Sequence, residues 1–495
     1  MKCHRQKGKI YISFEWWSTL SNVFFLLNIL LALSILFIER KSATSTWAWI
    51  MLLFFLPVIG FILYLFFGKP LSRKKLKPQH IYSNSNIQKH SAAQLNEIDK
   101  GSFARSPLIE EMQDSIRMHL KGNEAVLTMN NTIQIYTDGD EKFQALFHDI
   151  ENASYHIHLQ YFIVQDDKIG NQLMNLLTHK AKQGVSVLFL YDDVGSKSLS
   201  ADFFTEFLQS GGKAESLLSS KIPFFNLRFN YRNHRKSAVV DGMIGYIGGF
   251  NVGDEYVDGH KKLGYWRDTH LRVEGESVHA LQNQFLMDWN QASQQHPIKY
   301  DETYFPSPTG RETETAIQIV ASGPLTSYDH IKTGYLKLIT RAKKSIYIQT
   351  PYFIPDDSIL KALSMAVLSG VDVRIMIPDK PDHLFVRPAN MAFVHELLAV
   401  GAKVYQYSNG FLHAKTLIID QKAFSIGSAN MDVRSFSLNF EANAFIYDRE
   451  TAEKMARIFF RDVNVSEEFT MDFFESLSFY ARIKKRIARL IAPLL

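Results

Sequence analysis

Two long apolar runs open the chain, and shorter apolar runs alternate with polar segments after them. No charged residue interrupts the sequence from Trp16 to Ile38 or from Ser42 to Gly68. Each run is long enough for a helix to cross the roughly 30 Å hydrocarbon core of a bilayer. A signal peptide is the alternative for the first run, but no small-x-small cleavage site follows it. We therefore expect a transmembrane hairpin in residues 1–70, with helices at about 16–38 and 44–67.

Basic residues flank this hairpin unevenly. Only Arg40 and Lys41 lie between the two runs, whereas many basic residues lie outside them: Lys2, Arg5, Lys7, Lys9, Lys69, Arg73, Lys74, Lys75 and Lys77. Because lysine and arginine accumulate on the cytoplasmic side, both ends of the hairpin should be cytoplasmic. The sequence thus predicts a multi-pass protein of the cell membrane, with everything after residue 70 in the cytoplasm. The single cysteine, Cys3, excludes a disulfide within the chain and agrees with this compartment.

Residues 71–107 form a polar linker, with a short helix as an option within it, and after it the periodicity of the chain repeats. Each copy reads as strand, helix and strand, at residues 155–163, 171–182 and 185–190 in the first and at 346–354, 360–368 and 371–377 in the second. This alternation favours an α/β fold with helices on the faces of a sheet. We assign residues 108–309 to a first half and 315–480 to a second, pseudo-symmetric half.

The end of the chain, residues 471–495, has helical spacing. Phe473, Leu477, Tyr480 and several later apolar residues share one face, and most of the basic residues lie elsewhere. The pattern predicts a basic amphipathic helix. Two positions stay open for it: packing against the domain, or lying on a membrane surface.

A polar motif occurs once in each half. His234-Arg-Lys236 leads through an apolar run to Asp241, and His413-Ala-Lys415 leads in the same way to Asp420. Both copies continue alike, so that the pattern His-x-Lys-x4-Asp-x6-Gly-[Gly/Ser]-x-Asn ends at Asn251 and at Asn430. On a strand, residues two apart point to one face, so the histidine and lysine of each copy should project together. The occurrence of this motif in both halves indicates a functional site rather than two ordinary solvent-exposed strands. The motif regions are 229–256 and 408–435.

This paired motif resembles that of the phospholipase D superfamily. Trp266-Arg267-Asp268 and Asn439-Phe440-Glu441 match the family as well. The apolar segment from Gly60 to Pro70, the segment from Ser322 to Pro324 and the terminal Pro493-Leu494-Leu495 are similar to bacterial cardiolipin synthases. The resemblance implies two phospholipase D-like halves, each a mixed sheet flanked by helices, whose motifs meet at one site.

The resemblance also implies roles for these residues. One histidine attacks phosphorus, and the other protonates the leaving oxygen; we assign His234 to attack and His413 to acid–base work, although the symmetric motifs do not decide between them. Lys236 and Lys415 would hold the phosphoryl oxygens, with Asn251 and Asn430 as further donors. Asp268 and Glu441 would accept from the imidazoles. The motif does not decide between a structural and a catalytic role for Asp241 and Asp420.

The implied reaction joins two phosphatidylglycerol molecules into cardiolipin and releases glycerol, without cofactor or metal. Membrane phospholipids and the bilayer are the expected partners, and the oligomeric state is not predicted. A phospholipase D that uses water, a nuclease and an inactive scaffold are the alternatives. The net charge of +5 is mild and no basic, aromatic-interleaved stripe is present, so we expect no nucleic acid. His156, His158 and His270 are expected to be structural. The Asp-Asp pairs 192–193 and 356–357 are expected to be loop residues at strand ends, an edge of an α/β sheet where sites also form, so a place in the lining of the site stays open for them.

Overall fold

The computed structural model describes most of the chain. The described residues are 14–37, 43–64, 68, 85–103, 106–217, 230–293, 296–307, 315–326, 328–382 and 385–491. They form two compact units, one of Met1–Lys75 with Ser220–Asn230 and one of Leu76–Ser219 with Tyr231–Leu495. The second unit, the body, contains both motifs.

The smaller unit contains α1 (Phe14–Phe37), α2 (Ala43–Phe55) and α3 (Pro57–Leu63). The buried side-chain amide of Asn28, on α1, donates to the carbonyl oxygens of Leu53 and Pro57. The expected second helix, 44–67, is divided at Pro57, whose ring cannot continue the α2 hydrogen-bond ladder. Among the described residues, no helix combines the length and the apolar character that a bilayer crossing requires. The transmembrane hairpin therefore stays a prediction.

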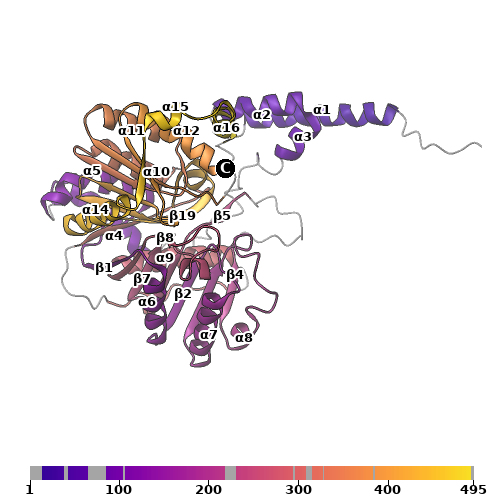
Figure 1. The fold of residues 1–495 in the computed structure, drawn as a ribbon. Helices are drawn as coiled ribbons and strands as arrows, with labels where there is room; N and C mark the ends of the chain where they lie inside the picture. Colours follow the sequence, from indigo (N-terminus) through magenta and orange to yellow (C-terminus); the bar gives the residue numbers. More distant parts are fainter. Residues whose placement is uncertain are drawn as a thin grey trace, which may run out of the picture. The chain divides into compact units, whose positions relative to one another are not determined.

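The first half of the body contains a mixed seven-stranded sheet with the order β1-β9-β7-β6-β2-β3-β4 (Figure 1). Strands β2, β3 and β4 are parallel, and the other neighbours are antiparallel. Its strands are β1 (Asn131–Tyr136), β2 (His156–Tyr161), β3 (Ser186–Tyr191), β4 (Lys213–Ser216), β6 (Ser237–Val240), β7 (Ile244–Gly248) and β9 (His270–Gly275). Its helices are α6 (Gly139–Glu151), α7 (Lys168–Lys182), α8 (Thr205–Gln209) and α9 (Ser277–Ala292).

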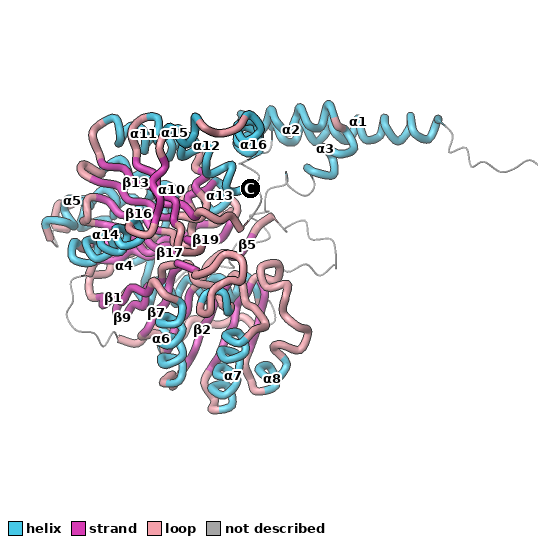
Figure 2. The backbone as a smooth tube through the Cα atoms, viewed as in Figure 1, coloured by secondary structure: helices cyan, strands magenta, loops and turns pink. Residues whose placement is uncertain are grey.

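The second half repeats this design around the parallel strands β11, β13 and β14. Strands β13, β16, β17 and β19 of this half are labelled in Figure 2. Its main path runs β10-β19-β17-β16-β11-β13-β14-β20. The strands are β10 (Ala316–Ser322), β11 (Ser345–Gln349), β13 (Asp372–Pro378), β14 (Lys403–Tyr407), β16 (Thr416–Ile419), β17 (Ala423–Gly427), β19 (Asn439–Tyr447) and β20 (Ser466–Phe469). The helices are α10 (His330–Arg341), α11 (Asp357–Leu368), α12 (Val386–Ala399), α13 (Val433–Ser437), α14 (Arg449–Val463), α15 (Met471–Glu475) and α16 (Phe479–Ile491).

Several short elements connect the main ones. They are β5 (Arg232–Asn233), β8 (Trp266–Arg267), β12 (Phe353–Ile354), β15 (Phe411–Leu412) and β18 (Met431–Asp432), with 3-10 turns at Asp254–Tyr256 and Glu302–Tyr304. The two pseudo-symmetric halves with mixed sheets, expected from the sequence, are confirmed. Their facing sheets share one apolar core, in which Ile247 and Leu271 of the first half lie with Phe424 and Ile426 of the second. Burial of this shared surface holds the halves together.

Helices α4 (Ser85–Asp99) and α5 (Pro107–Asn123) precede the first sheet but belong to the core of the second half. Ile116 and Leu120 of α5 lie in one cluster with Tyr335 and Leu338 of α10. The expected linker 71–107 thus contains the packed helix α4, and the expected first half begins its own sheet only at Asn131.

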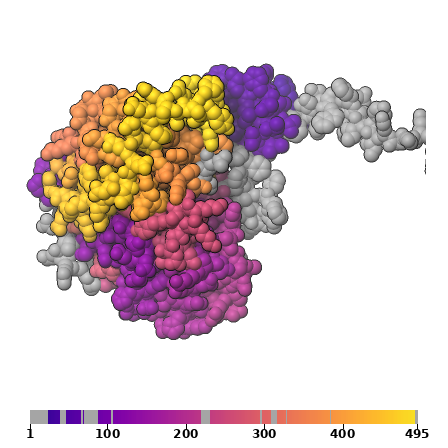
Figure 3. Space-filling view, viewed as in Figure 1, coloured from indigo at the N-terminus to yellow at the C-terminus, as the bar shows by residue number. Residues whose placement is uncertain are grey.

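The single helix expected over residues 471–495 is two helices in the structure. The chain breaks after Glu475, and the hydroxyl of Ser478 accepts from the backbone N–H of Ala481 in the first turn of α16. A serine at this position competes with continuous helix and favours a new start. Phe473 and Leu477 pack against the core of the second half, and Ala488 of α16 joins it, whereas the large apolar residues Phe479, Tyr480, Ile483, Ile487 and Leu490 do not. The C-terminal residues appear in yellow in Figure 3.

Candidate active site

Each motif histidine follows a short strand that pairs with the opposite half. Strand β5 pairs in parallel with the start of β19, and the backbone N–H of His234 donates to the carbonyl of Phe440 at 3.0 Å. Strand β15 pairs in the same way with β8, and the N–H of His413 donates to the carbonyl of Arg267 at 2.7 Å. Because Phe440 precedes Glu441 and Arg267 precedes Asp268, this pairing brings each histidine to a carboxylate of the other half.

The two imidazoles contact those carboxylates directly. Nδ1 of His234 lies 3.0 Å from Oε2 of Glu441, and Nδ1 of His413 lies 2.5 Å from Oδ2 of Asp268. Both carboxylates are fully buried. When Nδ1 carries the proton and donates it to the carboxylate, the Nε2 lone pair is left available. The site therefore contains two crossed histidine–carboxylate pairs, each assembled from both halves.

Two buried lysines complete this arrangement. The ammonium groups of Lys236 and Lys415 donate to the carbonyl oxygens of His234 and His413 respectively. Burial lowers the pKa of Lys236 well below its usual value, and burial lowers the pKa of Lys415 to about 8, while the buried carboxylates counter both effects. Each lysine also acts electrostatically on the histidine of the other motif. The structure thus brings the two histidines and two lysines into one site.

Burial favours the neutral form of both histidines. Burial, assisted by the charge of Lys236, lowers the pKa of His234 to about 4, although Glu441 acts in the opposite direction. Burial, assisted by Lys415, lowers the pKa of His413 to about 3. Burial alone would raise the pKa of Glu441, but His234 and Lys236 hold it below the usual value. An anion arriving beside the lysines raises the pKa of both imidazoles, which would allow one of them to carry a proton.

The two carboxylates are held by different groups. Glu441 accepts from the hydroxyl of Ser428 at 2.5 Å and from the side-chain amide of Asn439 at 3.1 Å. Asp268 accepts from the backbone N–H of Thr269 at 2.7 Å. It lies over Gly249, where a Cβ atom would come within 2.0 Å of its Oδ1. The glycine is thus required by a close approach, whereas the matching position in the second motif, Ser428, supplies a donor.

The motif aspartates lie at the far ends of strands β6 and β16. Asp241 accepts from the backbone N–H groups of residues 154, 155 and 156 at 2.7–2.8 Å. Asp420 accepts from the N–H groups of residues 343, 344 and 345 at 2.7–3.1 Å. Both have positive φ, 52° and 50°, in a region that aspartate tolerates better than most residues. These contacts fix the turns that lead into β2 and β11 and do not include the motif histidines His234 and His413.

The two asparagines also contact groups within their own halves. The amide of Asn251 donates to the hydroxyl of Tyr256 at 2.6 Å, and its oxygen accepts from the N–H of Ile163 at 3.1 Å. The backbone N–H of Asn430 donates to the hydroxyl of Ser435 at 3.2 Å. Asn251 therefore positions the loop after β2, and the expected role of both asparagines as phosphate donors stays a prediction.

Comparison with known proteins identifies the family of the chain. The sequence profile described as "Cardiolipin synthase, PLD-like domain" matches residues 146–289 and 335–463, which include both motifs. The chain belongs to this family. The family is that of the cardiolipin synthases, which are phosphatidyltransferases of the phospholipase D superfamily. A second profile, described as "Phospholipase_D-nuclease N-terminal", matches residues 26–69.

Cardiolipin synthases of other bacteria resemble the chain over nearly its whole length. The "Major cardiolipin synthase ClsA" of Bacillus subtilis is 48% identical over 97% of this chain and 99% of its own. A "Cardiolipin synthase" of Listeria monocytogenes is 47% identical over 96% of this chain and 98% of its own. The crystal structure of phosphatidylserine synthase from Haemophilus influenzae has a TM-score of 0.60 at 13% identity. The structural similarity covers 77% of this chain and all of that one, and it shows a shared fold only.

Two buried arginines of this cardiolipin synthase family member were not predicted as site residues. Arg235 donates to Asp288 of the first half and to the carbonyl oxygens of Glu441 and Ser322 of the second. Arg267 donates to the side chain of Asp462 and to the carbonyl of Asp268.

Each acidic partner is held in turn by a glutamine of a central strand. Gln160 of β2 donates to Asp288, and Gln349 of β11 donates to Asp462. The glutamines occupy matching places in the two copies. That symmetry was the sequence signal that could have identified the two glutamines as part of the site.

The remaining candidates have structural contacts. His156 and His158 are buried and lie beside the side chain of Gln282. Asp192 accepts from the N–H of Asn233, just before the first motif, at 2.9 Å. In the part of the chain that the structure describes, no group of three or more histidine, cysteine or acidic side chains is arranged to hold a metal ion.

Proposed function

We propose that this chain transfers a phosphatidyl group between two phosphatidylglycerol molecules and so forms cardiolipin and glycerol. The crossed pairs His234–Glu441 and His413–Asp268 are the observation that carries the proposal. Two imidazoles with fixed tautomers and two lysines at one site supply a nucleophile, a proton donor and positive charge, which phosphodiester exchange requires.

In the first step, Nε2 of His234 attacks phosphorus while the P–O bond to the glycerol headgroup breaks. His413, protonated at Nε2, gives its proton to the leaving glycerol oxygen. In the second step, His413 takes the proton from the headgroup hydroxyl of a second phosphatidylglycerol. That oxygen attacks phosphorus, the P–N bond to His234 breaks, and cardiolipin leaves. Lys236 and Lys415 hold the phosphoryl oxygens through both steps.

Reconstituted protein with pure phosphatidylglycerol tests the reaction. We expect cardiolipin and glycerol in equal amounts, and no loss of turnover in EDTA. Phosphatidic acid as the sole lipid product would contradict the proposal and indicate transfer to water. Because neither reaction partner leaves the bilayer, the same assay in proteoliposomes also tests the proposed membrane substrate.

We further propose that residues of about 16–38 and 44–67 form a transmembrane hairpin whose two ends are cytoplasmic. The apolar runs, the basic flanks and the match of residues 26–69 to the N-terminal profile support this topology. A membrane-impermeant maleimide should label Cys3 only after spheroplasts are permeabilised. Labelling in intact spheroplasts would contradict it.

A further inference from the structure

Helix α16 exposes its large apolar side chains. Phe479 and Tyr480 have exposed fractions of 80% and 76%, and Leu490 has 81%. Ile483 and Ile487 are exposed as well. At 3.6 residues per turn, these five side chains share one face of the helix.

The opposite face of α16 packs against α12. Ala488 is completely buried, and Ala481, Lys484 and Lys485 face a cavity beside α12. Arg489 forms an ion pair with Glu396 of α12. A helix on a soluble domain normally buries its apolar face, so α16 has the reverse orientation. A contiguous exposed apolar face of this kind marks an interaction surface.

The charge of α16 indicates the chemistry of the partner. The helix contains basic residues and no acidic ones: Arg482, Lys484, Lys485, Arg486 and Arg489. Among the described residues, Lys484, Lys485 and Arg486 take part in no ion pair. Burial and the neighbouring Arg486 and Arg482 lower the pKa of Lys485, as expected in a crowded group of cations. Such a group favours an anionic partner.

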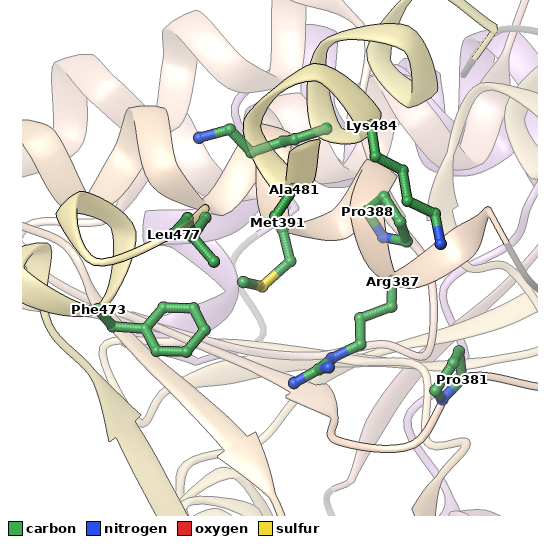
Figure 4. A pocket seen from close by; sticks show the side chains of 9 residues that line it. Pro381, Arg387, Pro388, Met391, Phe473, Leu477, Ala481 and Lys484 are labelled. Carbon is green, nitrogen blue, oxygen red and sulfur yellow. The ribbon is translucent and has the colours of Figure 1, made fainter. Parts of the chain in front are cut away.

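The cavity beside α16 combines apolar and cationic walls. Its volume is 370 Å³, and Phe473, Leu477 and Met391 lie on one side of it, with Lys484 on the other (Figure 4). Lys485 and, from α12, Arg387 contribute two further cations. A cavity of this size fits a small ligand, and this lining suits a phosphate group that carries an apolar chain.

We propose that α16 docks the second half onto a bilayer that contains anionic phospholipid. The apolar face enters the interfacial layer, and the basic residues beside it contact lipid phosphates. A helix with an apolar face and a basic flank suits a membrane surface, whereas a soluble protein partner is not expected to select for anionic lipid. The inference concerns recruitment to the surface and does not depend on the proposed reaction.

A fluorescent probe on α16 tests the contact in the full chain. Cys3→Ser supplies a background without cysteine, and Leu490→Cys in that background carries a nitrobenzoxadiazole label. In proteoliposomes of phosphatidylcholine with phosphatidylglycerol, we expect a blue-shifted emission that acyl-chain nitroxides quench. In phosphatidylcholine alone, we expect both effects to be much weaker. The matched control is Tyr155→Cys, at a side chain that is 75% exposed in the first half, and its probe should stay in water.

Two results of this experiment would overturn the proposal. Equal spectra in the two vesicle types would remove the requirement for anionic lipid. A blue-shifted probe that nitroxide lipids do not quench would show that protein, such as the N-terminal helices of the same chain, covers the face. Neither result depends on turnover, so the probe decides the proposal even if no cardiolipin forms.

A charge inserted into the apolar face supplies an independent test. Ile487→Asp should lower turnover of vesicular phosphatidylglycerol about tenfold or more, because it removes apolar contact with the bilayer. Turnover of a short-chain phosphatidylglycerol dissolved as monomers should not change. Leu208→Asp, at an exposed leucine of α8, is the matched control and should leave both rates unchanged. Equal loss on both substrates, at an unchanged unfolding temperature, would contradict the docking role.

Discussion

The half-site around His234 and the half-site around His413 share one plan and differ in how their carboxylates are held. Glu441 has side-chain donors from Ser428 and Asn439, whereas Asp268 has a backbone donor and rests against a glycine. The longer carboxylate therefore needs groups that position it, and the shorter one is positioned by the chain itself. The hydrogen bond to Nδ1 is the same in both half-sites, but we expect the groups that hold the two carboxylates to tolerate substitution differently.

The largest effect should follow from removing either imidazole. His234→Ala and His413→Ala should each lower kcat by about 10²–10⁴-fold, since both the attacking nitrogen and the proton donor are required. Turnover of phosphatidylglycerol in proteoliposomes measures this. A variant that retains full activity would show that its half-site takes no part in the chemistry.

Neutralising the carboxylates should have the next largest effect. Glu441→Gln and Asp268→Asn should lower kcat by about 10²-fold, because an amide can donate to Nδ1 and so fix the wrong tautomer. Circular dichroism and unfolding temperatures would show whether the fold is retained. If turnover were unchanged in both variants, the carboxylates would have no role in orienting the imidazoles.

The glycine and the serine that distinguish the half-sites allow a direct test of the asymmetry. Gly249→Ala places a Cβ atom where Asp268 lies and should lower kcat by about 10²-fold, as expected when a reacting group is displaced by about 1 Å. Ser428→Ala removes one donor to Glu441 and should cost about tenfold. Steady-state kinetics on both variants compares them, and equal losses would show that the two carboxylates tolerate change alike.

The smallest effect on turnover should come from the motif aspartates. Asp241→Asn and Asp420→Asn weaken hydrogen bonds to three backbone N–H groups each, at the strand ends away from the motif histidines. We expect kcat within about twofold of the original and an unfolding free energy lower by about 1–3 kcal/mol. Denaturant unfolding measures the latter. A large loss of kcat without loss of stability would assign these residues to catalysis.

Much of the fold followed from repetition in the sequence. The strand–helix–strand pattern and the double motif predicted two similar halves, because side-chain periodicity reports local structure and burial. The position of α5 was not predictable: its apolar stripe, including Ile116, shows that it packs but does not say against which half. The breaks at Pro57 and Ser478 depend on single residues within otherwise continuous apolar patterns.

The sequence predicted which residues form the candidate site, but it did not predict which carboxylate contacts which histidine. Sequence and family resemblance indicated His234, His413, Asp268 and Glu441, but each carboxylate contacts the histidine of the opposite half. That exchange arises from the β5–β19 and β15–β8 pairings, which join segments far apart in the chain. Short strands of two residues carry no periodicity of their own, so no local pattern predicts them.

Identification of the covalent intermediate shows whether His234 is the nucleophile. A rapidly quenched reaction with phosphatidylglycerol labelled at phosphorus, followed by peptide mapping under alkaline conditions, would locate a phosphohistidine. We predict label on the peptide that contains His234 in the original protein, and its accumulation in His413→Ala with a donor that carries an activated leaving group. Label on His413, or the absence of any labelled histidine in both experiments, would contradict the account.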